Sequence, residues 1–135
     1  GLCPLKLKKE GLILTIQKMI GDIEKMYNIS CNFIHDAFSI NDINTSTNIY
    51  RIIQESISNS MKHGKAKNIE ITLRKQEKGF YLKIEDDGRG LSEEHKDKKG
   101  MGMITMQTRA EAIEATLNTK PGEKGELCVE VFKNK

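Results

Sequence analysis

The segment from Glu85 to Met103, EDDGRGLSEEHKDKKGMGM, constrains the fold of this chain more than any other stretch. It ends an alternating strand, carries the glycine pair Gly88 and Gly90, and continues into a polar run, LSEEHKDKK, without apolar periodicity. A second pair, Gly100 and Gly102, then opens a helical pattern. Glycine lets a backbone approach a ligand closely, and free amides at a helix N-terminus bind phosphate. We therefore predict that the polar run is a lid over a phosphate-bearing ligand, the alternative being a loose surface loop.

Apolar residues elsewhere in the chain recur with the periods of helices and strands. NIEITLR and FYLKIED alternate apolar and polar residues, and KQEKG between them predicts a hairpin turn. The predicted helices span residues 11–26, 47–62 and 102–115, and the predicted strands span residues 30–34, 68–74, 80–86, 116–120 and 126–132. This order predicts an α+β fold, a two-layer α/β sandwich whose mixed sheet is covered on one face by helices.

Length and charge exclude several classes of protein. The 135 residues suit one domain, residues 1–135, and the net charge of +3 is too small for a dedicated nucleic-acid surface. No apolar run approaches the roughly 18 residues of a membrane helix, so we expect no membrane contact by this domain. Cys3, Cys31 and Cys128 are spaced for neither a disulfide framework nor a zinc site, which indicates a reducing cytoplasm. Because the chain begins at glycine, we expect a fragment of a longer protein.

The second predicted helix carries a polar stripe beside an apolar arc. Glu55, Asn59, Lys62 and His63 fall within about 100° of one another around the helix axis. Carboxylate and amide oxygens suit Mg²⁺, which usually takes phosphate oxygens as further ligands, and a nearby lysine suits phosphate. The alternative is an ordinary solvated helix face. The arc, which we expect to face the core, contains Ile49, Ile52, Ile53, Ser56, Ile57 and Ser60.

Three motifs in the chain resemble those of a known family. ESISNSMKHG, DDGRGL and GMGM resemble the N, G1 and G2 boxes of the GHKL ATPases, which include the gyrase, Hsp90, MutL and histidine-kinase families. The similarity is greatest to two-component sensor histidine kinases of the nitrate-sensor and DesK type, and it covers almost the whole chain. The resemblance implies a Bergerat fold in which ATP lies between the sheet, the second helix and the lid.

The resemblance also implies roles for the polar stripe. Asn59 is expected to bind Mg²⁺ and ATP. Glu55 is the expected catalytic residue, which either assists proton transfer from the attacking group or helps to hold the metal. Lys62 and His63 are expected to approach the phosphates or the ribose.

The resemblance implies the remaining roles for residues of the glycine-rich segment. Asp87 is expected to accept a hydrogen bond from the adenine amino group, and Gly88 and Gly90 to let the backbone pass the base. In the segment GMGM, which contains the second glycine pair, the expected ATP-binding residues are Gly100, Met101, Gly102 and Met103. Gly125-Glu126 departs from the usual Gly-Thr, which removes a hydroxyl that would support adenine binding.

The expected function is therefore the catalytic step of a sensor histidine kinase. The domain would pass the ATP γ-phosphoryl group to a histidine on a separate dimerisation domain, which would pass it to a response regulator. His35-Asp36 resembles an acceptor pair but follows a strand and lacks the expected downstream glutamine, so we expect the acceptor outside this chain. The domain is expected in the cytoplasm, with or without a membrane anchor in its parent.

Two other functions fit the same residues. A serine kinase of the anti-sigma-factor type shares the fold but transfers phosphate to a protein serine. A regulatory module would bind nucleotide, or only protein, without transfer, and the departure at Gly125-Glu126 keeps this alternative open.

Overall fold

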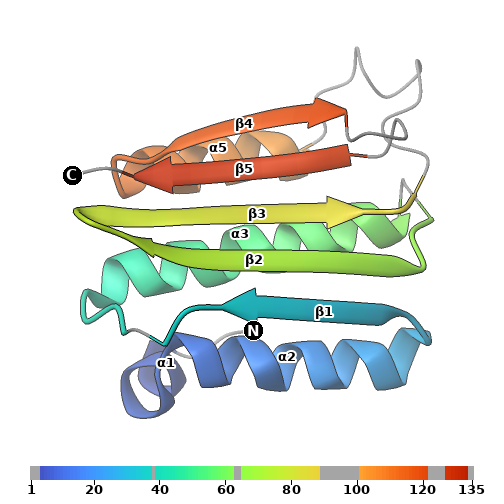
Figure 1. The fold of residues 1–135 in the computed structure, drawn as a ribbon, viewed down its shortest axis with the longest axis horizontal. Coiled ribbons are helices and arrows are strands. Elements are labelled where there is room, and N and C mark those ends of the chain that lie inside the picture. The colour runs from blue at the N-terminus through green and yellow to red at the C-terminus, as the bar shows by residue number, and fades with distance from the viewer. Residues whose placement is uncertain (1–3, 38, 63–64, 89–100, 122–126, 134–135) are drawn as a thin grey trace.

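The computed structural model of the chain describes residues 4–37, 39–62, 65–88, 101–121 and 127–133. Four helices and five strands are described in these ranges (Figure 1). The helices are α1 (Pro4–Glu10), α2 (Leu12–Tyr27), α3 (Ile43–Lys62) and α5 (Met101–Ala112). The strands are β1 (Ser30–His35), β2 (Asn68–Gln76), β3 (Gly79–Asp86), β4 (Thr116–Pro121) and β5 (Leu127–Lys133).

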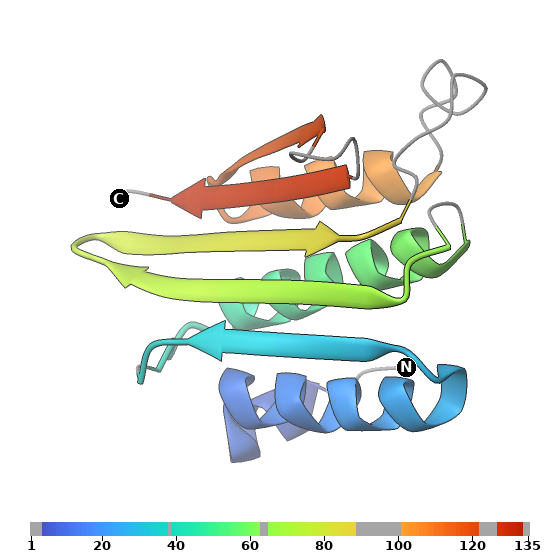
Figure 2. The ribbon, with the colours of Figure 1, turned by 45° about the vertical axis from the view of Figure 1, so that its right-hand side comes forward.

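The strands form one mixed sheet in the order β1-β2-β3-β5-β4. β1 pairs with β2 in parallel, and the other neighbours are antiparallel. In Figure 1, α3 runs behind β2 and β3 and α5 runs behind β4 and β5, while α2 lies along β1. Turning the molecule by 45° shows the same arrangement (Figure 2). The predicted α+β sandwich with a mixed sheet is therefore confirmed.

The alternation of apolar residues fixes which face of the sheet meets the helices. Ile71 pairs with Ile84, and Leu73 pairs with Leu82 across the β2–β3 hairpin. All four side chains are buried, because side chains two residues apart on a strand point to the same face. The predicted hairpin turn is confirmed, with Gln76 paired to Gly79 across a two-residue connection.

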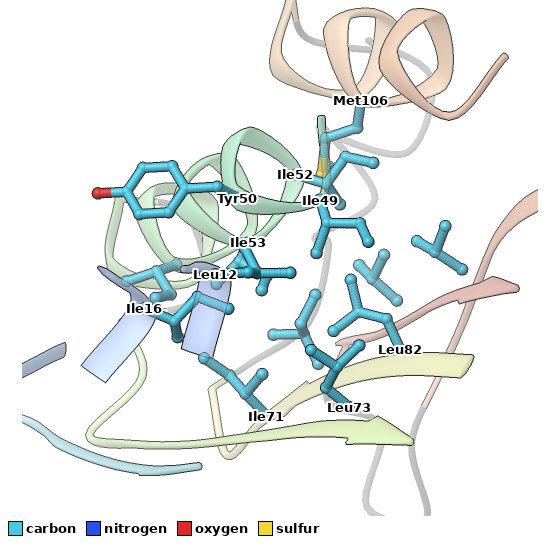
Figure 3. Close-up of a cluster of buried hydrophobic side chains, with 14 of the residues drawn as sticks. Leu12, Ile16, Ile49, Tyr50, Ile52, Ile53, Ile71, Leu73, Leu82 and Met106 are labelled. Carbon is cyan, nitrogen blue, oxygen red and sulfur yellow. The ribbon is translucent and has the colours of Figure 1, made fainter. Parts of the chain in front are cut away.

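The core lies between the sheet and the helices (Figure 3). Ile49, Ile52 and Ile53 of α3 are fully buried against β2 and β3, and Met106 of α5 is buried beside them. The arc predicted from the sequence is confirmed, since Ser56 and the other members are also buried. Burying one such side chain stabilises the fold by about 1.5–3 kcal/mol.

The helices differ from those predicted chiefly at the start of α3 and in the presence of α1. α3 begins at Ile43, four residues before the predicted start near residue 47, because the Asp42 carboxylate accepts hydrogen bonds from the backbone N–H groups of Asn44 and Thr45. The short helix α1 was not predicted at all. It is anchored by Leu7, which is 3% exposed, and is separated from α2 by Gly11, whose φ of 87° is favourable for glycine.

None of the described helices is both long enough and apolar enough to cross a membrane.

Candidate functional site

The N-terminal end of α5 lies against the polar stripe of α3. Glu55 and Asn59, one helical turn apart, are both half-buried. A Cβ atom placed on Gly102 would be 2.3 Å from Glu55 Oε1 and 3.0 Å from Asn59 Oδ1. Three residues singled out from the sequence are therefore together in space, and a residue with a side chain at position 102 would displace the other two.

This end of α5 has the electrostatic character of an anion site. The first amides of a helix have no partner within it and carry a partial positive charge. No acidic residue lies in the first turn of α5 to neutralise that charge. Ligand oxygens that reach these amides would also be beside the oxygens of Glu55 and Asn59. The arrangement suits a phosphate group with a bridging cation.

Contacts along α5 hold its N-terminal end in place. Met106 is fully buried, and the Ser56 hydroxyl of α3 lies 3.2 Å from its Sδ atom. Further along α5, Arg109 Nη1 donates to Asn48 Oδ1 of α3 at 3.5 Å. The position of Gly102 against Glu55 therefore depends on packing over the length of both helices.

Asp86, the last residue of β3, points toward α3 and is only 6% exposed. Its Oδ2 atom accepts a hydrogen bond from the Ser60 hydroxyl at 2.5 Å. Its Oδ1 atom accepts from the backbone N–H of Gly88 at 2.8 Å. A buried carboxylate, with one donor on each oxygen among the residues that the structure describes, thus lies next to the helix that carries Asn59, since Ser60 follows Asn59 directly.

The structure places the Asp87 carboxylate at the start of β2. Asp87 is exposed, and its Oδ1 atom accepts from the backbone N–H groups of Lys67 and Asn68, each at 2.9 Å. Its Oδ2 atom accepts from the Asn68 side-chain amide at 2.6 Å. Hydrogen bonds from Asn68, with a further one from Lys67, hold the pKa of Asp87 below its usual value. Asp87 therefore holds the backbone at the start of β2. Its side chain points away from α3, toward which Asp86 points, because strand alternation turns neighbouring residues in opposite directions.

A groove lies beside Asp87, mostly on the face of the sheet opposite the helices. This groove has a volume of about 560 Å³, and its walls include Glu70, Glu85, Asp86 and Asp87 with Lys83. An excess of carboxylates repels polyphosphate. The groove also includes neither the α3 stripe nor the N-terminal end of α5, so it is the weaker candidate for a nucleotide.

The other predicted site residues are only partly described. Lys62 is exposed at the C-terminal end of α3, one helical turn from Asn59. Met103 is partly buried against the core. Gly88 donates a hydrogen bond from its backbone N–H to the Asp86 carboxylate. His63, Gly90, Gly100, Gly125, Glu126 and the side chain of Met101 lie outside the described residues.

His35 lies at the end of β1, where its ring contacts Phe33 at a centroid distance of 4.8 Å. The neighbouring Asp36 carboxylate accepts from Arg74 Nη1 at 3.0 Å and from the backbone N–H of Lys75 at 2.7 Å. The Asp36 carboxylate is thus held by hydrogen bonds from β2. The phosphoacceptor histidine is still expected in sequence outside this chain.

Sequence reasoning did not single out Asp86 as a candidate site residue, nor its contact with Ser60. The signal was present, because Phe80, Leu82 and Ile84 set an alternation that also turns Asp86 inward. Ser60 belongs to the arc predicted to be buried, and it is 3% exposed.

The described residues contain no group of three or more His, Cys, Asp or Glu side chains that could hold a metal ion. A cation at Glu55 and Asn59 would therefore need further ligands from water or from a bound phosphate, as Mg²⁺ commonly has.

The sequence of the chain is similar to those of known proteins. Residues 44–134 match the family described as "Histidine kinase-, DNA gyrase B-, and HSP90-like ATPase". The sensor protein VraS of Staphylococcus saprophyticus is 30% identical over 119 residues, covering 87% of this chain and 33% of VraS. The oxygen sensor histidine kinase NreB of Staphylococcus carnosus is 30% identical over 120 residues, covering 87% of this chain and 34% of NreB. The chain thus spans about a third of the length of these relatives, which fit the nitrate-sensor/DesK-type subfamily.

The fold is also that of solved histidine-kinase structures. The histidine kinase domain of the blue-light activated kinase from Erythrobacter litoralis EL346 superposes with a TM-score of 0.73. It is 19% identical in sequence, and the alignment covers 91% of this chain and 60% of that one. The fold, the motifs and the family match agree, and the chain belongs to the family of histidine kinase-, DNA gyrase B- and HSP90-like ATPases.

Proposed function

We propose that this chain, residues 1–135, is the ATP-binding catalytic domain of a longer sensor histidine kinase. It would transfer the γ-phosphoryl group of ATP to a histidine on the dimerisation domain of its parent, from which the group would pass to a response regulator. The approach of Gly102 to Glu55 and Asn59 carries this proposal, because it joins metal-binding oxygens to the amide end of a helix. The free thiols of Cys31 and Cys128 agree with a cytoplasmic location.

We assign the adenine contact to Asp86 in place of Asp87. The acceptor for an adenine amino group needs to be shielded from water and fixed in orientation, because a hydrogen bond to a mobile, solvated carboxylate discriminates little. Within the described ranges, Asp86 is buried and has one protein donor on each oxygen, whereas Asp87 is exposed and already accepts three hydrogen bonds at the start of β2.

The phosphates belong at the other end of the site. Asn59 would hold Mg²⁺ through its amide oxygen, and the N-terminal amides of α5 would bind phosphate oxygens. Lys62 would supply positive charge from the C-terminal end of α3, and His63, the next residue in the sequence, would approach the phosphates or the ribose. Mg²⁺, when bound, would neutralise charge that develops on the phosphates during transfer.

Glu55 is the residue that we assign to proton handling. Phosphoryl transfer needs the attacking imidazole nitrogen to be unprotonated and aligned with the γ-phosphorus as ADP leaves. A carboxylate can accept a hydrogen bond from the imidazole nitrogen that does not attack, which keeps the proton there and leaves the attacking nitrogen unprotonated. The half-buried position of Glu55 beside Gly102 supports this role.

The test of binding is calorimetric titration of ADP and ATP with and without Mg²⁺. The unchanged chain should bind both nucleotides, and Asn59→Ala should remove the dependence on Mg²⁺. Asn32→Ala, the same substitution on the bare face of the sheet, is the matched control and should leave both affinities unchanged. A folded chain that binds no nucleotide would favour the protein-binding module.

The test of transfer uses the longer parent protein and ATP labelled on the γ-phosphorus. We expect label that is lost in acid and retained in base, as for phosphohistidine. Acid-stable label on serine would favour a serine kinase, and nucleotide binding without any label would favour a regulatory module.

A further inference from the structure

We propose that Ser60 is a positioning residue that orients the Asp86 carboxylate and thereby sets the preference for a purine with a 6-amino group. The proposal rests on the function proposed above, in which Asp86 meets the base. Its own basis is the direct hydrogen bond from the Ser60 hydroxyl to Asp86 Oδ2 at 2.5 Å, between residues that are 3% and 6% exposed.

Among the described residues, the carboxylate has one protein donor on each oxygen. The Gly88 backbone N–H donates to Oδ1 at 2.8 Å, and the Ser60 hydroxyl donates to Oδ2. The terminal torsion of an aspartate is soft, so a single donor leaves the carboxylate plane free to turn. Donors on both oxygens fix that plane. Each oxygen then keeps a lone pair for a ligand donor, since a carboxylate has about four acceptor positions in all.

This arrangement discriminates between purines by the chemistry of one group. A 6-amino group donates a hydrogen bond to the fixed carboxylate. A 6-oxo group presents lone pairs to the same oxygens and is repelled by them. Without Ser60, the carboxylate could turn away from a 6-oxo group, and the difference in binding affinity between the two bases would become smaller.

Ser60 also joins the two ends of the proposed site. It follows Asn59 directly on α3, so the helix that presents the Mg²⁺ ligand also orients the adenine acceptor. A purely structural bond between α3 and β3 would stabilise the fold without any effect on the choice of base. The experiment therefore has to measure discrimination as well as affinity.

Titration of ADP and inosine diphosphate into the Ser60→Ala variant, with Mg²⁺ present, separates these roles. We expect the unchanged chain to prefer ADP, and Ser60→Ala to weaken ADP binding about tenfold, roughly the effect of one hydrogen bond to a charged group. Binding of inosine diphosphate should change far less, so the ratio of the two affinities should fall.

Two further variants complete the test. Ser56→Ala removes an equally buried hydroxyl of the same helix that contacts Met106, and it should leave the ratio unchanged. Ser60→Cys keeps the packing and replaces a strong donor with a weak one, so it should give an intermediate ratio even if Ser60→Ala fails to fold.

The proposal is overturned if both nucleotides weaken by the same factor in the folded Ser60 variants, or if neither changes. If the unchanged, folded chain binds neither nucleotide, the proposed function fails first and this inference fails with it.

Discussion

Gly102 at the start of α5 lies against Glu55 of α3 so closely that an added Cβ atom would be 2.3 Å from the Glu55 carboxylate. The contact involves side-chain oxygens of α3, which can move, so the helices need not separate to admit a methyl group. A side chain at position 102 should therefore disturb the arrangement of the site more than it lowers the stability of the fold.

Gly102→Ala should weaken ADP binding by at least about tenfold while costing little stability, because alanine favours a helix by up to about 1 kcal/mol over glycine. The affinity is measured by calorimetry and the stability by urea unfolding. Gly21→Ala is the matched control, since its Cβ would meet nothing within 4 Å. That variant should be as stable as the unchanged chain or more so, with unchanged affinity. Equal affinities in both variants would contradict the predicted role of Gly102.

Met106→Ala should destabilise the fold by about 2–4 kcal/mol, since the residue is fully buried between α5 and α3. Urea unfolding measures the loss. Ile104→Ala, on the same helix but 51% exposed, should change the unfolding free energy by less than about 0.5 kcal/mol. Similar losses in the two variants would mean that α5 does not pack as described.

Asp87 should contribute to stability in a pH-dependent way. Its folded-state pKa is lowered, chiefly by hydrogen bonds from Asn68, so its contribution is present above its unfolded pKa of about 3.9 and is lost as the pH falls through the folded pKa. Asp87→Ala should cost about 1 kcal/mol at pH 7, a modest value because the site is exposed. Urea unfolding at pH 7, 5 and 3 should show the difference from the unchanged chain shrinking at pH 3. A difference as large at pH 3 as at pH 7 would refute this.

The two described cysteines should resist thiol reagents in the folded protein. Burial raises the pKa of Cys31 to about 12 and that of Cys128 to about 11, so both thiols stay protonated at pH 8. In a Cys3→Ser variant, reaction with DTNB should be at least about a hundredfold slower than in the denatured chain, since the thiolate is the reactive form. Rapid labelling of either cysteine without denaturant would show that its surroundings open readily.

Much of the fold follows from the sequence, because the apolar residues that recur with the period of a helix or a strand are also the residues that are buried. The alternation in β2 and β3 predicts both strands, their turn and their inward faces, and the isoleucine spacing predicts the buried face of α3. Helix α1 escapes prediction because seven residues with Leu7 as the buried anchor show no period. The start of α3 is ambiguous in sequence, because NDINTSTN offers several capping residues and the structure uses Asp42.

The site is less predictable than the fold. The motif DDGRGL offers two aspartates, and only the alternation of β3 decides that Asp86 and not Asp87 turns toward α3. The contact of Gly102 with Glu55 depends on how two helices pack, which no local pattern contains. Position on a helix face predicted the stripe, but tertiary packing determines what the stripe meets.

A nucleotide bound as proposed lies on the helix side of the sheet, with its base at Asp86. ADP titration into Asp86→Asn and Asp87→Asn, each checked for folding by circular dichroism, distinguishes the two carboxylates. We predict that Asp86→Asn weakens ADP binding about a hundredfold or more, since it removes a buried acceptor, and that Asp87→Asn changes it less than about threefold. Loss of binding in Asp87→Asn with normal binding in Asp86→Asn would mean that the base binds at Asp87 instead.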